Sequence, residues 1–179
     1  MTRILLSALL LGAMSLAVAQ ESNNSQNQSL LEKRNSIKFQ KLLAERIKTL
    51  EKNIPDMEPT APAPPVSGVW VIAVESTEGG WETIEDGAMV TVNDHGGSKF
   101  YAYTYVKGYG GFRDHANFAG NDAVPEGGPI PVDEDGDGVT DGWGQKWDIS
   151  KPPNDSGIFV FIANSINAGP SLSTSLRIR

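Results

Sequence analysis

The sequence predicts a mainly β protein: a small antiparallel β-sandwich with one long loop, preceded by one amphipathic α-helix. Three observations predict this fold class. Helical periodicity ends before Pro55, short apolar or alternating runs bounded by Gly, Asn and Asp follow, and five prolines within residues 55–65 separate the two regions. A chain of 179 residues has room for one ordinary domain and its appendages.

Residues 1–19 have the features of a secretory signal peptide. Arg3 precedes an apolar run from Ile4 to Val18, and Ala17 and Ala19 form a small-x-small cleavage pattern. A membrane-spanning helix needs about 20 apolar residues, and this run is shorter. We therefore expect a secreted, periplasmic or cell-surface protein that does not span a membrane after cleavage. The chain has no cysteine, which excludes a lipid-anchor cysteine and a disulfide scaffold.

Residues 20–29 are polar and are predicted to form a flexible leader. Residues 30–54 are predicted to form an amphipathic helical stem, with Ser29 and Glu32 as a capping box at its start. Its apolar face consists of Phe39, Leu42, Leu43, Ile47, Leu50 and Ile54. The spacing of the last four is typical of a coiled coil but spans only two heptads. Three roles stay open for this face: docking on the rest of the chain, self-association into a homo-oligomer, and contact with a membrane surface.

The proline-rich linker of residues 55–65 leads into a predicted β domain at residues 66–179. This domain holds 16 acidic and 7 basic residues, so it carries nearly all of the negative charge of the chain. A protein that neutralises nucleic-acid phosphates needs the opposite charge over a broad face. We therefore expect no nucleic-acid partner.

Five runs in the domain predict strands: Val69–Val74, Met89–Val92, Phe100–Lys107, Ile158–Ala163 and Leu172–Ile178. Residues 93–98 predict a hairpin turn between two of them. The stretch from Gly108 to Gly157 is rich in Gly, Pro and Asp and shows almost no strand signal, so it is predicted to be a long loop. A loop of that length needs something other than a hydrophobic core to order it.

The centre of this stretch has the spacing of a calcium-binding loop. Relative positions 1, 3, 5 and 9 are occupied by Asp133, Asp135, Asp137 and Asp141. Gly138 stands where such a loop turns sharply, and Val139 offers a backbone carbonyl at position 7. Calcium prefers six to eight oxygen ligands, which carboxylates at every second residue supply around one centre. We expect Ca²⁺ to be the cofactor and to order the loop.

Residues 133–144 resemble the bacterial thrombospondin type 3-like repeat, a relative of the EF-hand loop. The resemblance implies extracellular calcium binding through the four aspartates and implies nothing about the rest of the domain. At position 12, which is usually acidic, this sequence has Gly144. The missing ligand must come from elsewhere, with Asp148, Glu134, Asp122 and water as the alternatives.

Three tyrosines, Tyr101, Tyr103 and Tyr105, alternate along one predicted strand and therefore share one face of it. An exposed row of this kind stacks on sugar rings, whereas a buried row packs under the long loop or against a neighbouring sheet. The second alternative is favoured, because a buried tyrosine needs only one partner for its hydroxyl group.

His95 follows Asp94 and His115 follows Asp114, so a zinc site or an acid–base pair exists if the fold brings the four residues together. The sequence fixes no distance between them, and each histidine is predicted to lie at the surface in a turn. No nucleophile elbow, phosphate-binding loop or zinc-protease motif is present in the sequence.

These features favour an exported, calcium-binding structural or binding protein without enzymatic activity that acts at the cell surface or extracellularly. Its partner would be a carbohydrate or another protein. One alternative is a small secreted carbohydrate-active or hydrolytic enzyme with its site in residues 108–157. Another is a subunit of an extracellular filament or oligomer, assembled through the 30–54 helix or by exchange of the final strand.

Overall fold

The computed structural model describes residues 34, 37–39, 41–43, 45, 64–110, 114–150, 156–166 and 169–179. The predicted signal peptide, the polar leader and residues 55–63 of the linker lie outside this set. The chain forms two compact units, Met1–Gln40 and Lys41–Arg179, and all strands belong to the second.

The described residues between 34 and 45 are helical, as the sequence predicts for the stem. Phe39 and Leu43 of the predicted apolar face are buried, whereas Lys38, Lys41 and Glu45 are exposed. Within the described part of the chain, no helix combines the length and the apolar character needed to cross a membrane.

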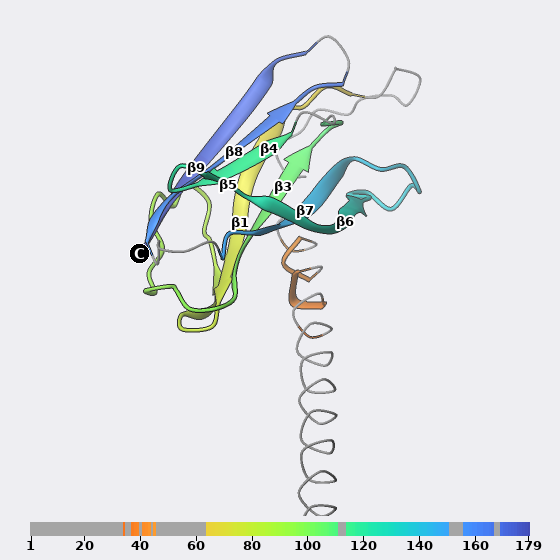
Figure 1. Cartoon of the computed structure of the whole chain (residues 1–179). Helices are drawn as coiled ribbons and strands as arrows, with labels where there is room; N and C mark the ends of the chain where they lie inside the picture. Colours follow the sequence, from red (N-terminus) through yellow and green to blue (C-terminus); the bar gives the residue numbers. More distant parts are fainter. Residues whose placement is uncertain are drawn as a thin grey trace, which may run out of the picture. The chain divides into compact units, whose positions relative to one another are not determined.

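The β domain contains nine strands. Figure 1 labels all of them except β2. They are β1 (Gly68–Ser76), β2 (Gly80–Thr83), β3 (Phe100–Lys107), β4 (His115–Phe118), β5 (Asn121–Asp122), β6 (Val124–Val132), β7 (Gly142–Asp148), β8 (Gly157–Asn164) and β9 (Ser171–Ile178).

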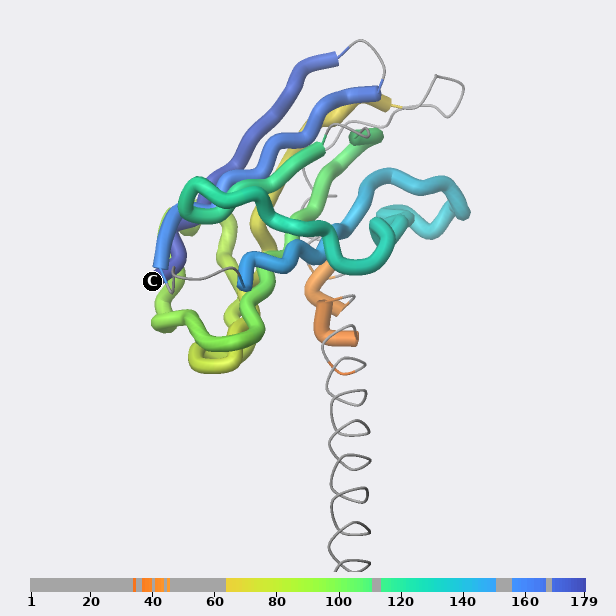
Figure 2. Tube along the Cα trace, in the orientation of Figure 1, coloured from red at the N-terminus to blue at the C-terminus, as the bar shows by residue number. Residues whose placement is uncertain are grey.

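The strands form two antiparallel sheets, which confirms the predicted β-sandwich. Sheet A has the order β2-β1-β3-β7-β6, and sheet B has the order β5-β4-β8-β9. The chain passes from sheet B to sheet A at Ala123, between β5 and β6, and returns between β7 and β8. Figure 2 shows the β6–β7 hairpin projecting from one side of the domain, away from the end of β9.

The core lies between the sheets because both present alternate apolar residues to each other. Sheet A contributes Val71, Val74, Phe100, Ala102, Val106 and Trp147, and sheet B contributes Ala116, Phe118, Phe159, Phe161, Ala163, Leu176 and Ile178. Aromatic rings join the layers: Phe100 contacts Phe118 edge to face at 5.2 Å, and Trp147 lies 5.5 Å from Phe161. Such pairs add to the free energy that area burial supplies.

Four of the predicted strands are confirmed. The run Phe100–Lys107 is β3 with the same bounds, and the predicted runs Val69–Val74, Ile158–Ala163 and Leu172–Ile178 lie within β1, β8 and β9. Burial alternates along β8 and toward the end of β9, whereas β1 and β3 are buried over most of their length.

The prediction of a long loop from Gly108 to Gly157 is wrong, because this stretch supplies β4, β5, β6 and β7. Two of these strands are very short, and β6 contains three prolines, Pro125, Pro129 and Pro131. Proline is tolerated on an edge strand, where its missing N–H faces solvent. Only residues 133–141, between β6 and β7, form an acidic loop.

The segment Met89–Val92 is not a strand, although its composition predicts one. Val90 forms one isolated parallel bridge with Arg177 of β9, through Thr91 N–H to Arg177 C=O and Arg177 N–H to Met89 C=O, each at 2.9 Å. Residues 93–98 therefore do not form a hairpin turn. They connect this segment, at the edge of sheet B, to β3 in sheet A.

A buried hydrogen bond in the sandwich can be tested by substitution. Trp147 Nε1 donates to Thr104 Oγ1 at 2.8 Å, and Thr104 is fully buried. Thr104→Val keeps the shape but leaves the indole N–H without a partner, so we expect the free energy of unfolding to fall by about 1–3 kcal/mol in urea denaturation. Thr83→Val, at an exposed position, is the control and should change it by less. Equal effects would contradict a role for this bond.

Candidate metal centre

The acidic loop of residues 133–141 is closed at its base by backbone hydrogen bonds. Asp141 N–H donates to Val132 C=O at 2.7 Å, and Gly108 N–H donates to Asp141 C=O at 2.7 Å. The last pair of β6 and β7, Val132 and Gly142, directly precedes and follows the loop. The sandwich therefore holds both ends of the loop, and one of them also contacts the residue after β3.

Three of the predicted ligands come together. One carboxylate oxygen each of Asp133, Asp135 and Asp141 lies within 4.8 Å of the other two. Asp133 is held from inside the loop, since its two oxygens accept hydrogen bonds from Gly136 N–H at 2.7 Å and Gly138 N–H at 2.9 Å. The carboxylates thus point to a common centre.

The backbone conformation of the loop explains why two of its positions are glycine. Gly136 and Gly138 adopt φ values of +80° and +86°, in the left-handed region that residues with a Cβ rarely occupy. These two turns bring the backbone N–H groups under Asp133. The position of Gly138 in the motif is therefore explained by the geometry of the loop.

The other two predicted ligand positions lie outside this trio. Asp137 Oδ1 accepts a hydrogen bond from Val139 N–H at 2.7 Å, and Asp135 Oδ1 accepts one from Asp137 N–H at 3.1 Å. Asp137 and Val139 are both exposed. Of the predicted oxygen set of Asp133, Asp135, Asp137, Val139 and Asp141, the carboxylate of Asp137 is not part of the converging group, and the Val139 carbonyl stays a predicted ligand.

None of the three acidic side chains considered for position 12 is placed to supply that ligand. Glu134 turns away from the aspartates and contacts the Tyr105 hydroxyl and the Lys107 ammonium group. Asp148 lies at the opposite end of β7, about 20 Å along the strand from Gly142. Asp122 lies on β5 in the other sheet. Of the predicted alternatives for position 12, this placement leaves water.

The charges of the loop affect the pKa of Asp141. Burial raises the pKa of the Asp141 carboxyl above its ordinary value, the hydrogen bond from Glu134 N–H lowers it, and the charges of Asp135, Glu134 and Asp137 raise it further. Burial and the neighbouring charges therefore disfavour ionisation of Asp141. A cation at the centre of the trio would reverse this effect.

The tyrosine row lies on the face of β3 that points away from the core. Tyr103 and Tyr105 are buried, and the Tyr103 hydroxyl donates to Glu75 at 2.6 Å while that of Tyr105 donates to Glu134. Burial, followed by these hydrogen bonds, raises the pKa of both hydroxyl groups. Two of the three rings are therefore closed to a stacking ligand. The contact of Tyr105 with Glu134 agrees with the alternative in which the row packs against the acidic loop.

Tyr101 is the partly accessible member of the row. The ammonium group of Lys146 lies 3.7 Å above its ring centroid and also pairs with Glu126 at 2.8 Å. The remaining aromatic pairs on this side are Trp70 with Tyr105, Trp81 with Tyr103, and Tyr109 with Trp143. Aromatic side chains here mostly contact one another, which does not favour a sugar-binding platform.

His95 is not a surface residue, contrary to the prediction. It is buried between Ser76 of β1 and Glu82 of β2, with Ser76 Oγ 3.0 Å from Nδ1 and Glu82 Oε2 3.2 Å from Nε2. Because Gly79 N–H and Gly96 N–H both donate to Ser76 Oγ, its two lone pairs are used and its proton points to Nδ1. Nε2 then carries the hydrogen that faces Glu82.

This serine–histidine–glutamate cluster organises a loop. Glu82 also accepts hydrogen bonds from Val92 N–H and Asn93 N–H, each at 2.7 Å, and His95 N–H donates to the backbone oxygen of Arg179. Ser76 is 6% exposed, so its hydroxyl group is not presented to a substrate. No pattern in the sequence predicts this cluster, because its three members share no motif.

His115 does not join this cluster. It is exposed on β4, where it pairs with Ile162 of β8, whereas His95 lies beside the opposite end of sheet B near Arg179. The neighbouring acids differ as well: Asp114 Oδ1 accepts a hydrogen bond from Asn164 N–H at 2.7 Å, and Asp94 lies 3.9 Å from Arg179 Nε. The four residues do not assemble a zinc or acid–base site.

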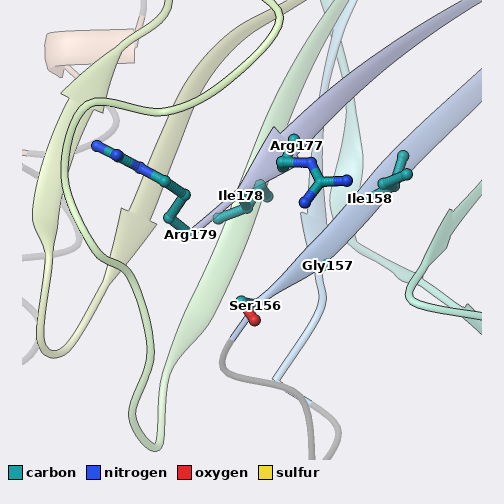
Figure 3. A pocket seen from close by; sticks show the side chains of 6 residues that line it. All are labelled: Ser156, Gly157, Ile158, Arg177, Ile178 and Arg179. Carbon is teal, nitrogen blue, oxygen red and sulfur yellow. The ribbon is translucent and has the colours of Figure 1, made fainter.

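Two hollows of the described surface lie away from the acidic loop. One is lined by Ser156, Gly157, Ile158, Arg177, Ile178 and Arg179 (Figure 3). The other lies between Ile84–Met89, the start of β1 and the outer side of β9. Neither hollow includes an aspartate of the acidic loop or the buried His95.

The buried carboxylate of Glu82 provides a test of the histidine cluster. Glu82→Gln turns an amide N–H₂ group toward donors that need an acceptor, so we expect the free energy of unfolding to fall by about 1–3 kcal/mol. Glu78→Gln, on the exposed turn after β1, is the charge-matched control and should have little effect. Labelling of Ser76 by a serine-directed fluorophosphonate would contradict the structural role, because it requires a free hydroxyl group.

Substitution of Asp141 provides a second test, in which the raised pKa sets the direction of the change in stability with pH. A folded-state pKa raised above the unfolded value gives stability that is present below the unfolded pKa and is lost as the pH rises through the folded pKa. In chelator at about pH 7, Asp141→Asn should therefore be at least as stable as the unsubstituted protein in thermal melts. The difference should shrink as the pH falls through the carboxyl range. A less stable variant with no pH dependence would contradict this electrostatic account.

Comparison with known proteins identifies the family of the β domain. Residues 61–178 match the model of the family described as "Domain of unknown function (DUF4879)". No curated protein and no solved structure matches the chain. The matched residues include every strand of sheets A and B. The chain therefore belongs to the DUF4879 family.

Proposed function

We propose that this protein is exported and that its acidic loop binds Ca²⁺, which stabilises the β-sandwich for a structural or binding role at the cell surface or outside the cell. The export part of the proposal rests on the signal-peptide pattern of residues 1–19. The metal part rests on the acidic loop.

The observation that carries the proposal is the convergence of Asp133, Asp135 and Asp141, whose oxygens lie within 4.8 Å of one another. Three carboxylates at this separation repel one another by roughly 1 kcal/mol per pair even in bulk water. No basic residue lies between Gly127 and Gln145 to offset that repulsion. A hard divalent cation would replace repulsion by coordination.

The oxygen donors favour calcium over the common transition metals. The predicted set contains carboxylates and one carbonyl but no histidine or thiolate, and oxygen-rich sites suit Mg²⁺, Ca²⁺ and Mn²⁺. Calcium accepts the irregular, partly hydrated shell that a loop with glycine at position 12 offers, whereas Mg²⁺ demands near-octahedral geometry. Millimolar extracellular calcium also suits a site with an incomplete ligand set.

Binding of a cation to the acidic loop would affect the sandwich through Glu134. This residue stands next to Asp133 in the loop, and its side chain contacts Tyr105 and Lys107 of β3. Its backbone N–H donates to Asp141 Oδ2 at 2.7 Å. Ordering the loop around a cation would therefore fix the contact between the β6–β7 hairpin and the central strand of sheet A.

The enzyme alternative has less support. Its site is expected in a long loop at residues 108–157, and that stretch supplies the strands β4–β7 in place of one loop. The carboxylates that converge in the described residues are those of the acidic loop, where they share one exposed turn and no hollow. A binding or structural role uses this arrangement without a substrate cleft.

The proposal is tested by calcium titration of the purified protein in a calorimeter, with thermal melts in calcium and in chelator. For a dissociation constant of about 0.1 mM and calcium at about 10 mM, binding stabilises the folded state by about 2.7 kcal/mol. We expect saturable heat and a rise in the melting temperature on the order of 10 °C. Mg²⁺ should give a smaller effect at the same concentration.

A charge-matched pair of variants makes the test specific. Asp133→Asn with Asp135→Asn should abolish both the heat and the shift in melting temperature. Glu78→Gln with Glu85→Gln removes the same charge from exposed positions outside the loop and should leave both unchanged. Absence of heat and shift in the unsubstituted protein, or their survival in the loop variant, would refute the proposal.

A further inference from the structure

Among the residues that the structure describes, one edge of sheet B has no partner strand along most of its length. Arg177 of β9 bonds outward to the Met89–Thr91 segment, so by the alternation of antiparallel pairing the N–H and C=O groups of Ser171, Ser173 and Ser175 also point outward. Among the described residues, that segment is the only one that pairs with this side of β9. The open part of the edge therefore runs from Ser171 to Ser175.

The other three sheet edges are protected. On sheet A, β2 has four residues, and β6 combines three prolines with an irregular register between Glu126 and Ile130. On sheet B, β5 has two residues. Short edge strands, prolines and bulges are the usual means of preventing edge-to-edge pairing. The β9 edge has none of these, since its sequence from 171 to 175 is Ser-Leu-Ser-Thr-Ser.

The charge distribution favours a second copy of the chain as the occupant of this edge. The domain from residue 66 onward has 16 acidic residues, which would oppose self-association over most of its surface. No acidic residue lies between 156 and 179, the stretch that contains β8 and β9. The acidic residues Glu85 and Asp86 line a hollow together with Thr174, Ser175 and Leu176 at one end of the open edge. In Figure 3, Arg177 points toward Ile158 of β8 and Arg179 points away toward the 89–95 segment.

Exposed apolar side chains flank the open edge at both ends. Met89 and Val92, near Arg177, are 80% and 79% exposed, and Ile166, beyond the start of β9, is 51% exposed. A polar strand edge between two apolar ends is self-complementary under a two-fold rotation, because the rotation brings each end of one copy to the opposite end of the other.

We propose that two copies of this chain pair antiparallel through β9, about a two-fold axis at Ser173. The four-stranded sheet B of one copy would then continue into sheet B of the other. The open edge is bounded by Pro170 and by the bridge at Arg177, and Ser173 is its midpoint. In this register Ser173 faces Ser173 of the second copy, and Ser171 faces Ser175. A two-fold interface of this kind closes and gives a dimer, not a filament.

Cysteine substitution tests the axis directly, because the chain has no cysteine of its own. Residues in a hydrogen-bonded antiparallel pair have Cα atoms about 5.5 Å apart, within disulfide range. Under mild oxidation we expect full-length Ser173→Cys to form a covalent dimer. Ser171→Cys alone should cross-link much less, whereas a mixture of Ser171→Cys and Ser175→Cys should form the mixed dimer.

Light scattering over a concentration series provides the second measurement. We expect a dimer for the unsubstituted protein and loss of the dimer in Ser173→Lys, which places like charges opposite each other at an exposed position. Ser156→Lys, exposed and outside the edge, should still form the dimer. The proposal is overturned if the unsubstituted protein stays monomeric and Ser173→Cys cross-links no faster than Ser171→Cys. It is equally overturned if the dimer persists in a folded Ser173→Lys variant.

Discussion

The burial of both faces of β3 is the constraint on which the rest of the β domain depends. One face gives Phe100, Ala102 and Val106 to the core between the sheets, and the other carries Tyr103 and Tyr105. A strand buried on both sides cannot slip by one residue, because the slip would exchange the two sets of side chains. Its position therefore sets the register of β1 and β7 on either side, and through β7 the place of the acidic loop.

The acidic loop is joined to this central strand by charge as well as by backbone pairing. Glu134 brings a carboxylate to Tyr105 and Lys107, while its neighbours converge on the centre of the loop. Gly142 follows the loop where a Cβ would lie 2.4 Å from Val106 C=O, so only glycine allows this close approach. The loop and the sheet are thus one structural unit, in which the sandwich supplies rigidity and the loop supplies the charge.

Negative charge is distributed unevenly over the domain. Acidic residues crowd the loop of residues 133–141, whereas β8 and β9 carry none. The His95 cluster holds Met89–His95 against the end of β9 with neutral and charged hydrogen bonds. This arrangement places the proposed cation site and the proposed self-association edge on different parts of the sandwich, so that the two functions can be examined separately.

The sequence by itself determined those features that depend on neighbours along the chain. Alternation along one strand was sufficient to predict β3 with its bounds. The spacing of four aspartates within nine residues predicted a carboxylate cluster, and three of them, Asp133, Asp135 and Asp141, converge. The strands β4–β7 escaped prediction because glycine- and proline-rich segments become strands only when a partner strand supplies their hydrogen bonds. The tertiary structure alone decided the partners of His95, the turn of Glu134 away from the aspartates, and the open edge of β9. Each of these joins residues that are distant in sequence, and local composition carries no information about such contacts.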